Sequence, residues 1–163
     1  MKTINQIRLI KLGYITTLVA VVLFSLNDAS RGFADGYQDA GSTSVFGVVK
    51  GLFILLICFL SSRVFVYLYR FINSVEVGNV FTEENSKLLN RIGWYCTIMP
   101  FLVFVFNGLE YLQQSSIHKD LLFDIVKNVD FQIWLLIFGL TILTIAFVFK
   151  KGIELKQEND LTI

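Results

Sequence analysis

The chain has 163 residues, of which 55% are hydrophobic, and a net charge of +1. Soluble domains are typically about 45–50% apolar, so this composition and a mean hydropathy of +0.64 argue against a soluble domain. The near-neutral charge excludes the basic excess typical of direct nucleic-acid binding. Four stretches almost free of charge are each long enough to cross about 30 Å of hydrocarbon. The sequence therefore predicts an all-α, polytopic membrane protein, a single domain of four transmembrane helices with short amphipathic surface helices.

The first membrane helix is expected at about residues 9–27, after a start with three basic residues and no acid. A basic start before an apolar run is also typical of a secretory signal peptide. Small residues at the spacing of a cleavage site do not follow cleanly after Ser25. We therefore favour a retained helix, with processing as the alternative. Residues 27–44 are rich in Gly, Ser and Asp and are expected to form an irregular loop.

The second membrane helix is expected at about residues 45–69, and a polar segment at residues 70–92 follows it. Within that segment, Thr82 is the expected N-cap of a short amphipathic helix that runs into the third membrane helix. Glu83 lies in the first turn of this helix, where the helix dipole favours an anion. It also precedes Lys87 by four residues, a spacing that favours an ion pair.

The third and fourth membrane helices are expected at about residues 93–112 and 131–149, with a polar tail at residues 150–163. Between them, apolar residues recur at helical spacing from residue 115 to residue 130. This pattern predicts a short amphipathic helix at the membrane surface. His118, the single histidine, lies on its polar side, and one histidine without further ligands does not make a zinc site.

The basic residues predict the orientation of the chain. Four crossings put both termini on one side, which then receives ten basic residues: Lys2, Arg8, Lys11, Arg63, Arg70, Lys87, Arg91, Lys150, Lys151 and Lys156. The other side receives four: Arg31, Lys50, Lys119 and Lys127. We therefore expect both termini, and the segment at residues 70–92, to face the cytoplasm.

A pattern Gly-x-x-Phe/Leu-x-x-Glu-Asn occurs twice, 74 residues apart. Its members are Gly78, Phe81, Glu84, Asn85, Gly152, Leu155, Glu158 and Asn159. Each copy follows a predicted hairpin of two membrane helices, which suggests a duplicated hairpin, although a match of four positions also arises by chance. The two copies are expected to bend and cap helices, to form a pair of similarly built elements on which a cytoplasmic partner docks, or to do both.

At these residues the chain resembles a family of small bacterial membrane proteins known as domain of unknown function 2975. The distinctive stretches are residues 78–85, 89–93 and 149–163. The resemblance implies a four-helix protein of the bacterial cytoplasmic (inner) membrane. It also implies a regulatory pairing, because members are often encoded beside a small helix-turn-helix regulator. It offers no catalytic residues for this chain.

Two pairs of residues within the predicted helices are candidates for helix contacts. Lys50 and Glu110 each lie a few residues inside the outer end of a helix, so their depths should match. They either form an intramembrane ion pair or reach the interface separately. Gly47 and Gly51 form a small-xxx-small pair that would permit close helix packing.

No phosphate-binding loop, Ser-His-Asp set or HExxH pattern occurs, so we expect no enzyme activity, cofactor or metal. Cys58 and Cys96 are expected to be packing thiols. The preferred function is a non-enzymatic membrane protein that binds or regulates a protein partner through its cytoplasmic face. The alternative is an oligomeric channel or transporter with Lys50, Asn107 and Glu110 at its mouth, or an accessory subunit of a larger membrane complex. The expected partners are the lipid bilayer, a cytoplasmic regulator or larger membrane complex, and further copies of the chain, but not nucleic acid.

Overall fold

The computed structural model describes residues 2–38, 45–114 and 129–160. These residues form four helices and no strand: α1 (Lys2–Gln38), α2 (Val45–Glu76), α3 (Glu83–Gln114) and α5 (Ile133–Asp160). All four are long and apolar enough to cross a membrane, which confirms the predicted fold class. The amphipathic helix predicted at residues 115–130, with His118, lies almost wholly outside the described residues.

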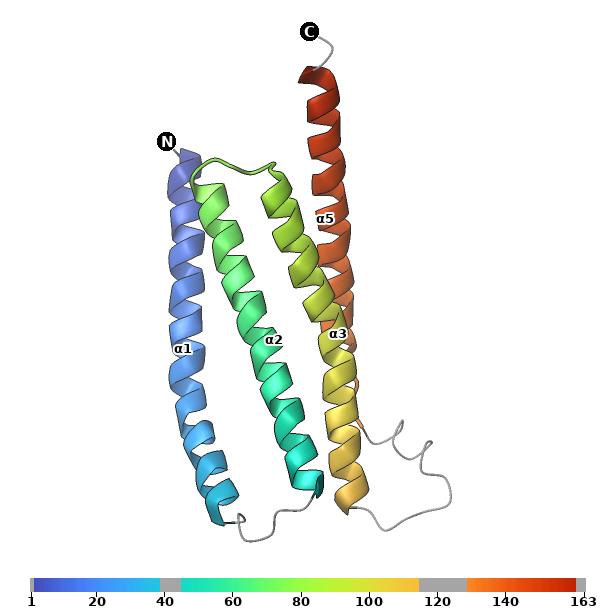
Figure 1. The fold of residues 1–163 in the computed structure, drawn as a ribbon. Coiled ribbons are helices and arrows are strands. Elements are labelled where there is room, and N and C mark those ends of the chain that lie inside the picture. The colour runs from blue at the N-terminus through green and yellow to red at the C-terminus, as the bar shows by residue number, and fades with distance from the viewer. Residues whose placement is uncertain (1, 39–44, 115–128, 161–163) are drawn as a thin grey trace.

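The helices alternate in direction, so α1 and α3 begin at the end of the bundle where α2 and α5 finish (Figure 1). At that end α5 extends beyond the other helices. α3 packs most extensively against α5 and next against α2, while α1 makes its main contact with α2. The order of packing therefore makes α3 the central helix and α1 a peripheral one.

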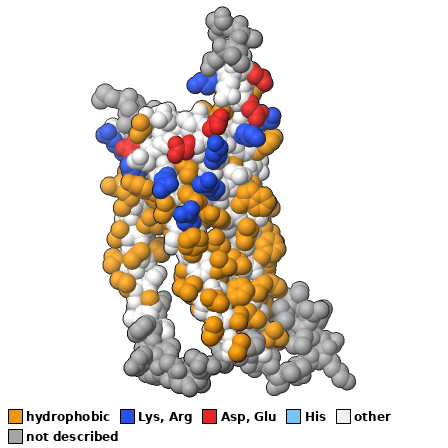
Figure 2. Space-filling view, in the orientation of Figure 1, with side chains coloured by type: hydrophobic (Ala, Val, Ile, Leu, Met, Phe, Trp, Pro, Cys, Tyr) orange, Lys and Arg blue, Asp and Glu red, His pale blue; other side chains and the backbone are white. Residues whose placement is uncertain are grey.

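Figure 2 shows a broad hydrophobic belt with the charged side chains gathered at one end. We call this the charged end; it is where α1 and α3 begin and α2 and α5 finish, and its ion pairs join Arg8, Lys11, Glu76, Glu83, Lys87, Lys151 and Glu154. Large apolar side chains in the belt are exposed, among them Phe24 (81%) and Leu55 (68%). Such an exposed apolar surface around a helical bundle fits lipid tails as its surroundings.

The helices are longer than the sequence predicted. The loop expected at residues 27–44 is helical as far as Gln38, because each glycine costs only about 1 kcal/mol in a helix and no proline interrupts the segment. α2 likewise continues to Glu76, and the polar tail expected at residues 150–163 is helical as far as Asp160. The polar segment between the second and third helices is thereby reduced to a turn at residues 77–82.

Two glycines allow α3 and α5 to approach closely. A Cβ atom on Gly139 would lie 2.6 Å from the backbone nitrogen of Thr97, and one on Gly93 would lie 2.7 Å from the Leu143 side chain. Nothing lies within 4 Å of the Cβ position of Gly51, so the close packing predicted there is not found at that glycine. Small residues permit such backbone contacts only where a second helix faces them.

One buried hydrophobic cluster lies where α2 meets α3, in the half of the bundle nearer the charged end, and α5 contributes the buried side chains of Ala146 and Ile153. Tyr67, Leu88, Ile92 and Cys96 form one buried cluster. Cys96 is 4% exposed, as expected of a packing thiol, whereas Cys58 is exposed and so does not pack in the core.

Candidate interaction surface at the charged end

The turn at residues 77–82 joins α2 to α3 at the charged end. Gly78 has a φ of +92°, a conformation that residues with a side chain rarely adopt, so glycine is favoured there. Its backbone N–H donates a hydrogen bond of 3.0 Å to the Val75 carbonyl at the end of α2. At the start of α3, the Thr82 hydroxyl accepts a hydrogen bond of 3.2 Å from the Asn85 backbone N–H. Thr82 is therefore the N-cap that the sequence predicted.

The Asn85 side chain ties the turn to α3. It is 0% exposed, and its Nδ2 donates hydrogen bonds to the backbone carbonyls of Asn79 and Val80. These two carbonyls lie in the turn, outside the hydrogen-bond pattern of α3, and the Asn85 side chain supplies their hydrogen-bond donor. Asn85 was predicted to contact a partner, but a side chain this deeply buried has no surface to offer one.

Phe81 brings the two copies of the repeated pattern together. Its ring centroid lies 5.1 Å from that of Phe149, and a Cβ atom on Gly152 would lie 3.8 Å from the Phe81 ring. Phe81 nevertheless stays 56% exposed. The turn, Gly152 and Lys156 line a cavity of about 490 Å³.

The two copies differ in conformation, so the prediction of similarly built elements is wrong. Residues 78–85 form a turn and the first turn of α3, whereas residues 152–159 lie wholly within α5. Among the described residues, Gly78 is the glycine with a positive φ. Gly152 stays helical because strong helix formers flank it, and Lys151 pairs with Glu154 at 2.6 Å across it. The same residue spacing therefore occurs in two different local structures.

A groove of about 670 Å³ runs between the start of α3 and the second half of α5. Its floor is apolar and its rim is polar. The lining residues on α3 are Glu83, Ser86, Lys87, Asn90 and Trp94, and those on α5 are Leu143, Ala146, Phe147, Lys150, Ile153, Glu154 and Gln157. The sequence analysis proposed none of the α5 residues in this groove as binding residues, because their approach to α3 depends on Gly93 and Gly139.

The rim of this groove carries both signs of charge. Lys87 lies 3.4 Å from Glu83, the predicted pair, and both side chains are well exposed. Lys151 pairs with Glu154. Exposed pairs of this kind contribute at most about 1 kcal/mol to stability. Their charges are accordingly available to a molecule that binds along the groove.

The other members of the repeated pattern are at the surface. Glu84, Leu155, Glu158 and Asn159 are all exposed, and Leu155 is 60% exposed. Seven of the eight predicted residues thus lie at the charged end with some accessible surface, and Asn85 is the exception.

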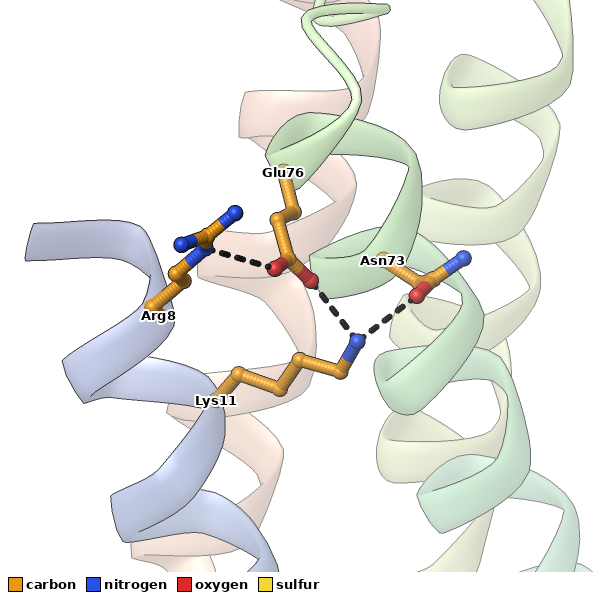
Figure 3. Close-up of polar contacts among 4 residues, drawn as sticks. All are labelled: Arg8, Lys11, Asn73 and Glu76. Carbon is orange, nitrogen blue, oxygen red and sulfur yellow. Dashed lines mark hydrogen bonds and ion pairs between the residues drawn. The ribbon is translucent and has the colours of Figure 1, made fainter. Parts of the chain in front are cut away.

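A polar cluster that the sequence analysis missed joins α1 to α2 (Figure 3). The Lys11 Nζ donates hydrogen bonds to Asn73 Oδ1 at 2.8 Å and to Glu76 Oε2 at 2.7 Å. Arg8 lies 3.4 Å from the other oxygen of Glu76. No local pattern could have predicted this cluster, since its members are separated by more than 60 residues. It fixes the start of α1 against the end of α2.

At the opposite end of the bundle, Lys50 Nζ lies 3.9 Å from Glu110 Oε1. The two side chains are 22% and 47% exposed, so neither is sealed inside the protein. Their helices run antiparallel, and this places the two residues at the same depth, as the sequence led us to expect. At 3.9 Å the contact is a loose ion pair rather than a tight hydrogen bond.

Within residues 2–38, 45–114 and 129–160, no three side chains of His, Cys, Asp or Glu come together as a metal site would require. A family model described as "Protein of unknown function (DUF2975)" matches residues 32–163. The match covers α2, α3, α5 and the last residues of α1. No curated protein and no solved structure matches the chain.

Proposed function

This chain belongs to the family described as "Protein of unknown function (DUF2975)", and from that premise we propose that it is a non-enzymatic membrane protein that binds a protein partner at its charged end. We place it in the bacterial cytoplasmic membrane with the charged end in the cytoplasm, because the excess of basic residues gathers there. The partner is either a cytoplasmic regulator or a subunit of a larger membrane complex.

The observation that carries this proposal is the exposure of large apolar side chains at the charged end. Val77, Phe81 and Leu155 are 72%, 56% and 60% exposed. A helix crosses the hydrocarbon in about 20 residues, and α5 has 28. Phe149 of α5 lies against Phe71 near the end of α2 and against Phe81 of the turn, so Leu155, six residues further along α5, lies beyond the lipid tails. Apolar side chains exposed to water among charges are typical of a binding site.

The shape of the groove between α3 and α5 favours a helix as the bound element. An apolar floor with charges of both signs along its rim suits an amphipathic helix, whose apolar stripe fills the floor. Outside this groove, Phe81 is exposed in the second cavity, which Gly152 and Lys156 also line, and Leu155 is exposed on the last part of α5. They would act as anchors, and Lys150 and Glu158 would select the partner's charges.

The experiment is photo-crosslinking in cells that make the protein. A photoreactive amino acid replaces Leu155, and a second version carries it at Leu140, which is 50% exposed but lies within the belt, beside Gly139. We expect one defined protein adduct at position 155 and none at position 140. Substitution of Phe81→Ser should reduce the adduct at least about fivefold, since it removes an anchor.

Phe24→Ser is the matched control, because Phe24 is exposed on α1 in the belt and should leave the adduct unchanged. Adducts to lipid alone at both positions, or an adduct that Phe81→Ser does not weaken, would contradict the proposal.

A further inference from the structure

Three arginines lie on one face of α2 and α3, where the hydrophobic belt meets the charged end. Figure 2 shows Lys and Arg side chains grouped there, over α2 and α3 and apart from the acidic side chains nearer the end of the bundle. The three are Arg63 and Arg70 on α2 and Arg91 on α3. Arg63 and Arg70 are seven residues apart, which places them on the same stripe of the helix. We call these three residues the arginine patch.

The patch is not neutralised by the part of the chain that the structure describes. Lys11, Lys87 and Lys151 at the charged end each have a carboxylate within 4 Å. None of the ion pairs among the described residues involves an arginine of the patch. Like charges held side by side repel one another, so the patch favours an anion from outside the chain.

Two of the guanidinium groups are held in place by one buried ring. The guanidinium carbons of Arg63 and Arg91 lie 4.9 Å and 5.7 Å from the centroid of the Tyr67 ring. Arg63 also donates a hydrogen bond to the Tyr67 hydroxyl. Tyr67 is only 2% exposed, and its ring stacks on Tyr95 at 5.9 Å. The ring therefore orients both cations while most of their N–H donors stay free.

The depth of the patch matches the phosphate layer of a bilayer. Lys50 marks the opposite interface, and Arg70 follows it by 20 residues on the same helix, or about 30 Å of rise. That is the thickness of the hydrocarbon core. Arg63 lies about 10 Å deeper by the same measure. Its guanidinium carbon lies 4.9 Å from the centroid of the Tyr67 ring and 5.9 Å from that of Phe59, and a long arginine side chain can extend from this depth to the interface.

We propose that the arginine patch binds the phosphate group of an anionic phospholipid from the leaflet at the charged end. Guanidinium groups bind phosphate oxygens through paired N–H donors, and clustered basic residues between membrane helices recognise anionic headgroups. The exposed apolar side chains of α2 below Arg63 would contact the acyl chains. This site is separate from the groove between α3 and α5, so the lipid-binding proposal does not depend on the partner-binding proposal, and each can fail independently.

The test measures lipid binding to the purified full-length protein in detergent by native mass spectrometry. The probes are dioleoyl phosphatidylglycerol, which is anionic, and dioleoyl phosphatidylcholine, which has the same acyl chains and no net charge. We expect the anionic lipid to bind at least about tenfold more tightly. The double variant Arg63→Gln/Arg91→Gln should lose this preference, and Arg91→Lys should keep only part of it, since an ammonium cannot bind in the paired geometry.

Arg31→Gln is the matched control, because it also removes one exposed arginine but near the far end of α1. Its preference for the anionic lipid should equal that of the unmodified protein. The proposal is overturned if the double variant keeps the tenfold preference, or if Arg31→Gln reduces it equally. Should the double variant fail to fold by circular dichroism, Arg91→Gln alone decides, and an unchanged preference then overturns the proposal.

A soluble phosphate ester presents the same chemistry as the headgroup. Glycerol 3-phosphate is therefore added as a competitor at millimolar concentration. We expect it to displace little of the anionic lipid, since it lacks the acyl chains that contact the belt. Tight binding of glycerol 3-phosphate that displaces most of the anionic lipid and that the double variant loses would assign the patch to a soluble ligand and overturn the lipid assignment.

Discussion

Asn85 lies near a helix N-terminus, where the helix dipole normally favours a carboxylate. Its hydrogen-bond partners explain why the side chain is an amide instead. Its Nδ2 faces two backbone carbonyl oxygens, those of Asn79 and Val80. An acidic side chain there would gain about 0.3–1 kcal/mol from the helix dipole. It would also turn an acceptor towards two acceptors in a buried site, at a cost of about 1–3 kcal/mol or more. The second effect is larger, so the site selects a donor.

The substitution Asn85→Asp tests that comparison of magnitudes at almost constant shape. We expect a loss of about 2 kcal/mol, which lowers the melting temperature in detergent by about 4–8 °C. Asn90→Asp is the control, because Asn90 is exposed on the same helix and should change stability by less than about 0.5 kcal/mol. A variant as stable as the unmodified protein would mean that the gain from the helix dipole fully offsets the lost hydrogen bonds.

Residue types alone could predict Thr82 as a cap and Glu83 with Lys87 as a pair, because both features depend on spacing within one helix. The burial of Asn85 could not be predicted, since it depends on the path of the turn before it. The same limit applies to Arg91, whose contact with the Tyr67 ring crosses from one helix to another. Sequence spacing predicts interactions along an element well and interactions between elements poorly.

At the scale of the elements, the close contact of α3 with α5 depends on glycines that no motif identifies. Gly47 and Gly51 have the spacing of a packing motif, yet the Cβ position of Gly51 is open. Gly93 and Gly139 lie on different helices and form the actual contact. Small residues permit an approach but do not specify the partner helix, so the sequence could not distinguish the two sets.

Gly139→Ala should separate α3 from α5. The added methyl would lie 2.6 Å from the backbone nitrogen of Thr97, and backbone cannot move aside as a flexible side chain can. We expect a loss of about 1–3 kcal/mol in thermal unfolding in detergent. Gly51→Ala meets no atom within 4 Å and should be neutral or slightly stabilising. Equal effects of the two substitutions would show that close packing is not the cause.

The attachment of α1 depends on few contacts, because no part of its apolar, membrane-spanning stretch is buried within the protein. Among the polar contacts described between α1 and α2, the Tyr14 hydroxyl donates to the Phe65 carbonyl at 2.8 Å, and Lys11 and Arg8 contact Glu76 and Asn73. Glu76→Gln should weaken the contact with Lys11 and Arg8 and let α1 move away from α2. The other helices do not depend on this cluster and should keep their stability.

The measurement uses spin labels on Thr17 of α1 and Ser62 of α2, both exposed, with Cys58 and Cys96 replaced. In Glu76→Gln the distribution of distances between the labels should broaden and shift to longer values. Glu84→Gln removes an exposed carboxylate from α3 and should leave the distribution as it was. A narrow distribution in Glu76→Gln would mean that lipid packing alone holds α1 in place.

At the scale of the whole molecule, the number of membrane helices and their alternation could be predicted because hydrophobic length is a strong signal. The exact ends of the helices could not be predicted, because polar residues with a high helix propensity, such as those from Lys150 to Asp160, are found both within helices and after them. The projection of α5 beyond the bundle is therefore a structural finding, and the proposed binding surface depends on it.

The orientation of the bundle in the membrane decides which molecules can reach that surface. Single cysteines at Leu155 and Val45, in a protein without Cys58 and Cys96, mark the two ends. If the basic residues set the topology, a membrane-impermeant maleimide should label position 155 only after the cells are opened, and position 45 in intact spheroplasts. Both sites are exposed, at 60% and 82%, so a lack of labelling reports the membrane rather than burial. Labelling of position 155 from outside would place the groove, Phe81 and the arginine patch on the external side, where no cytoplasmic regulator can bind.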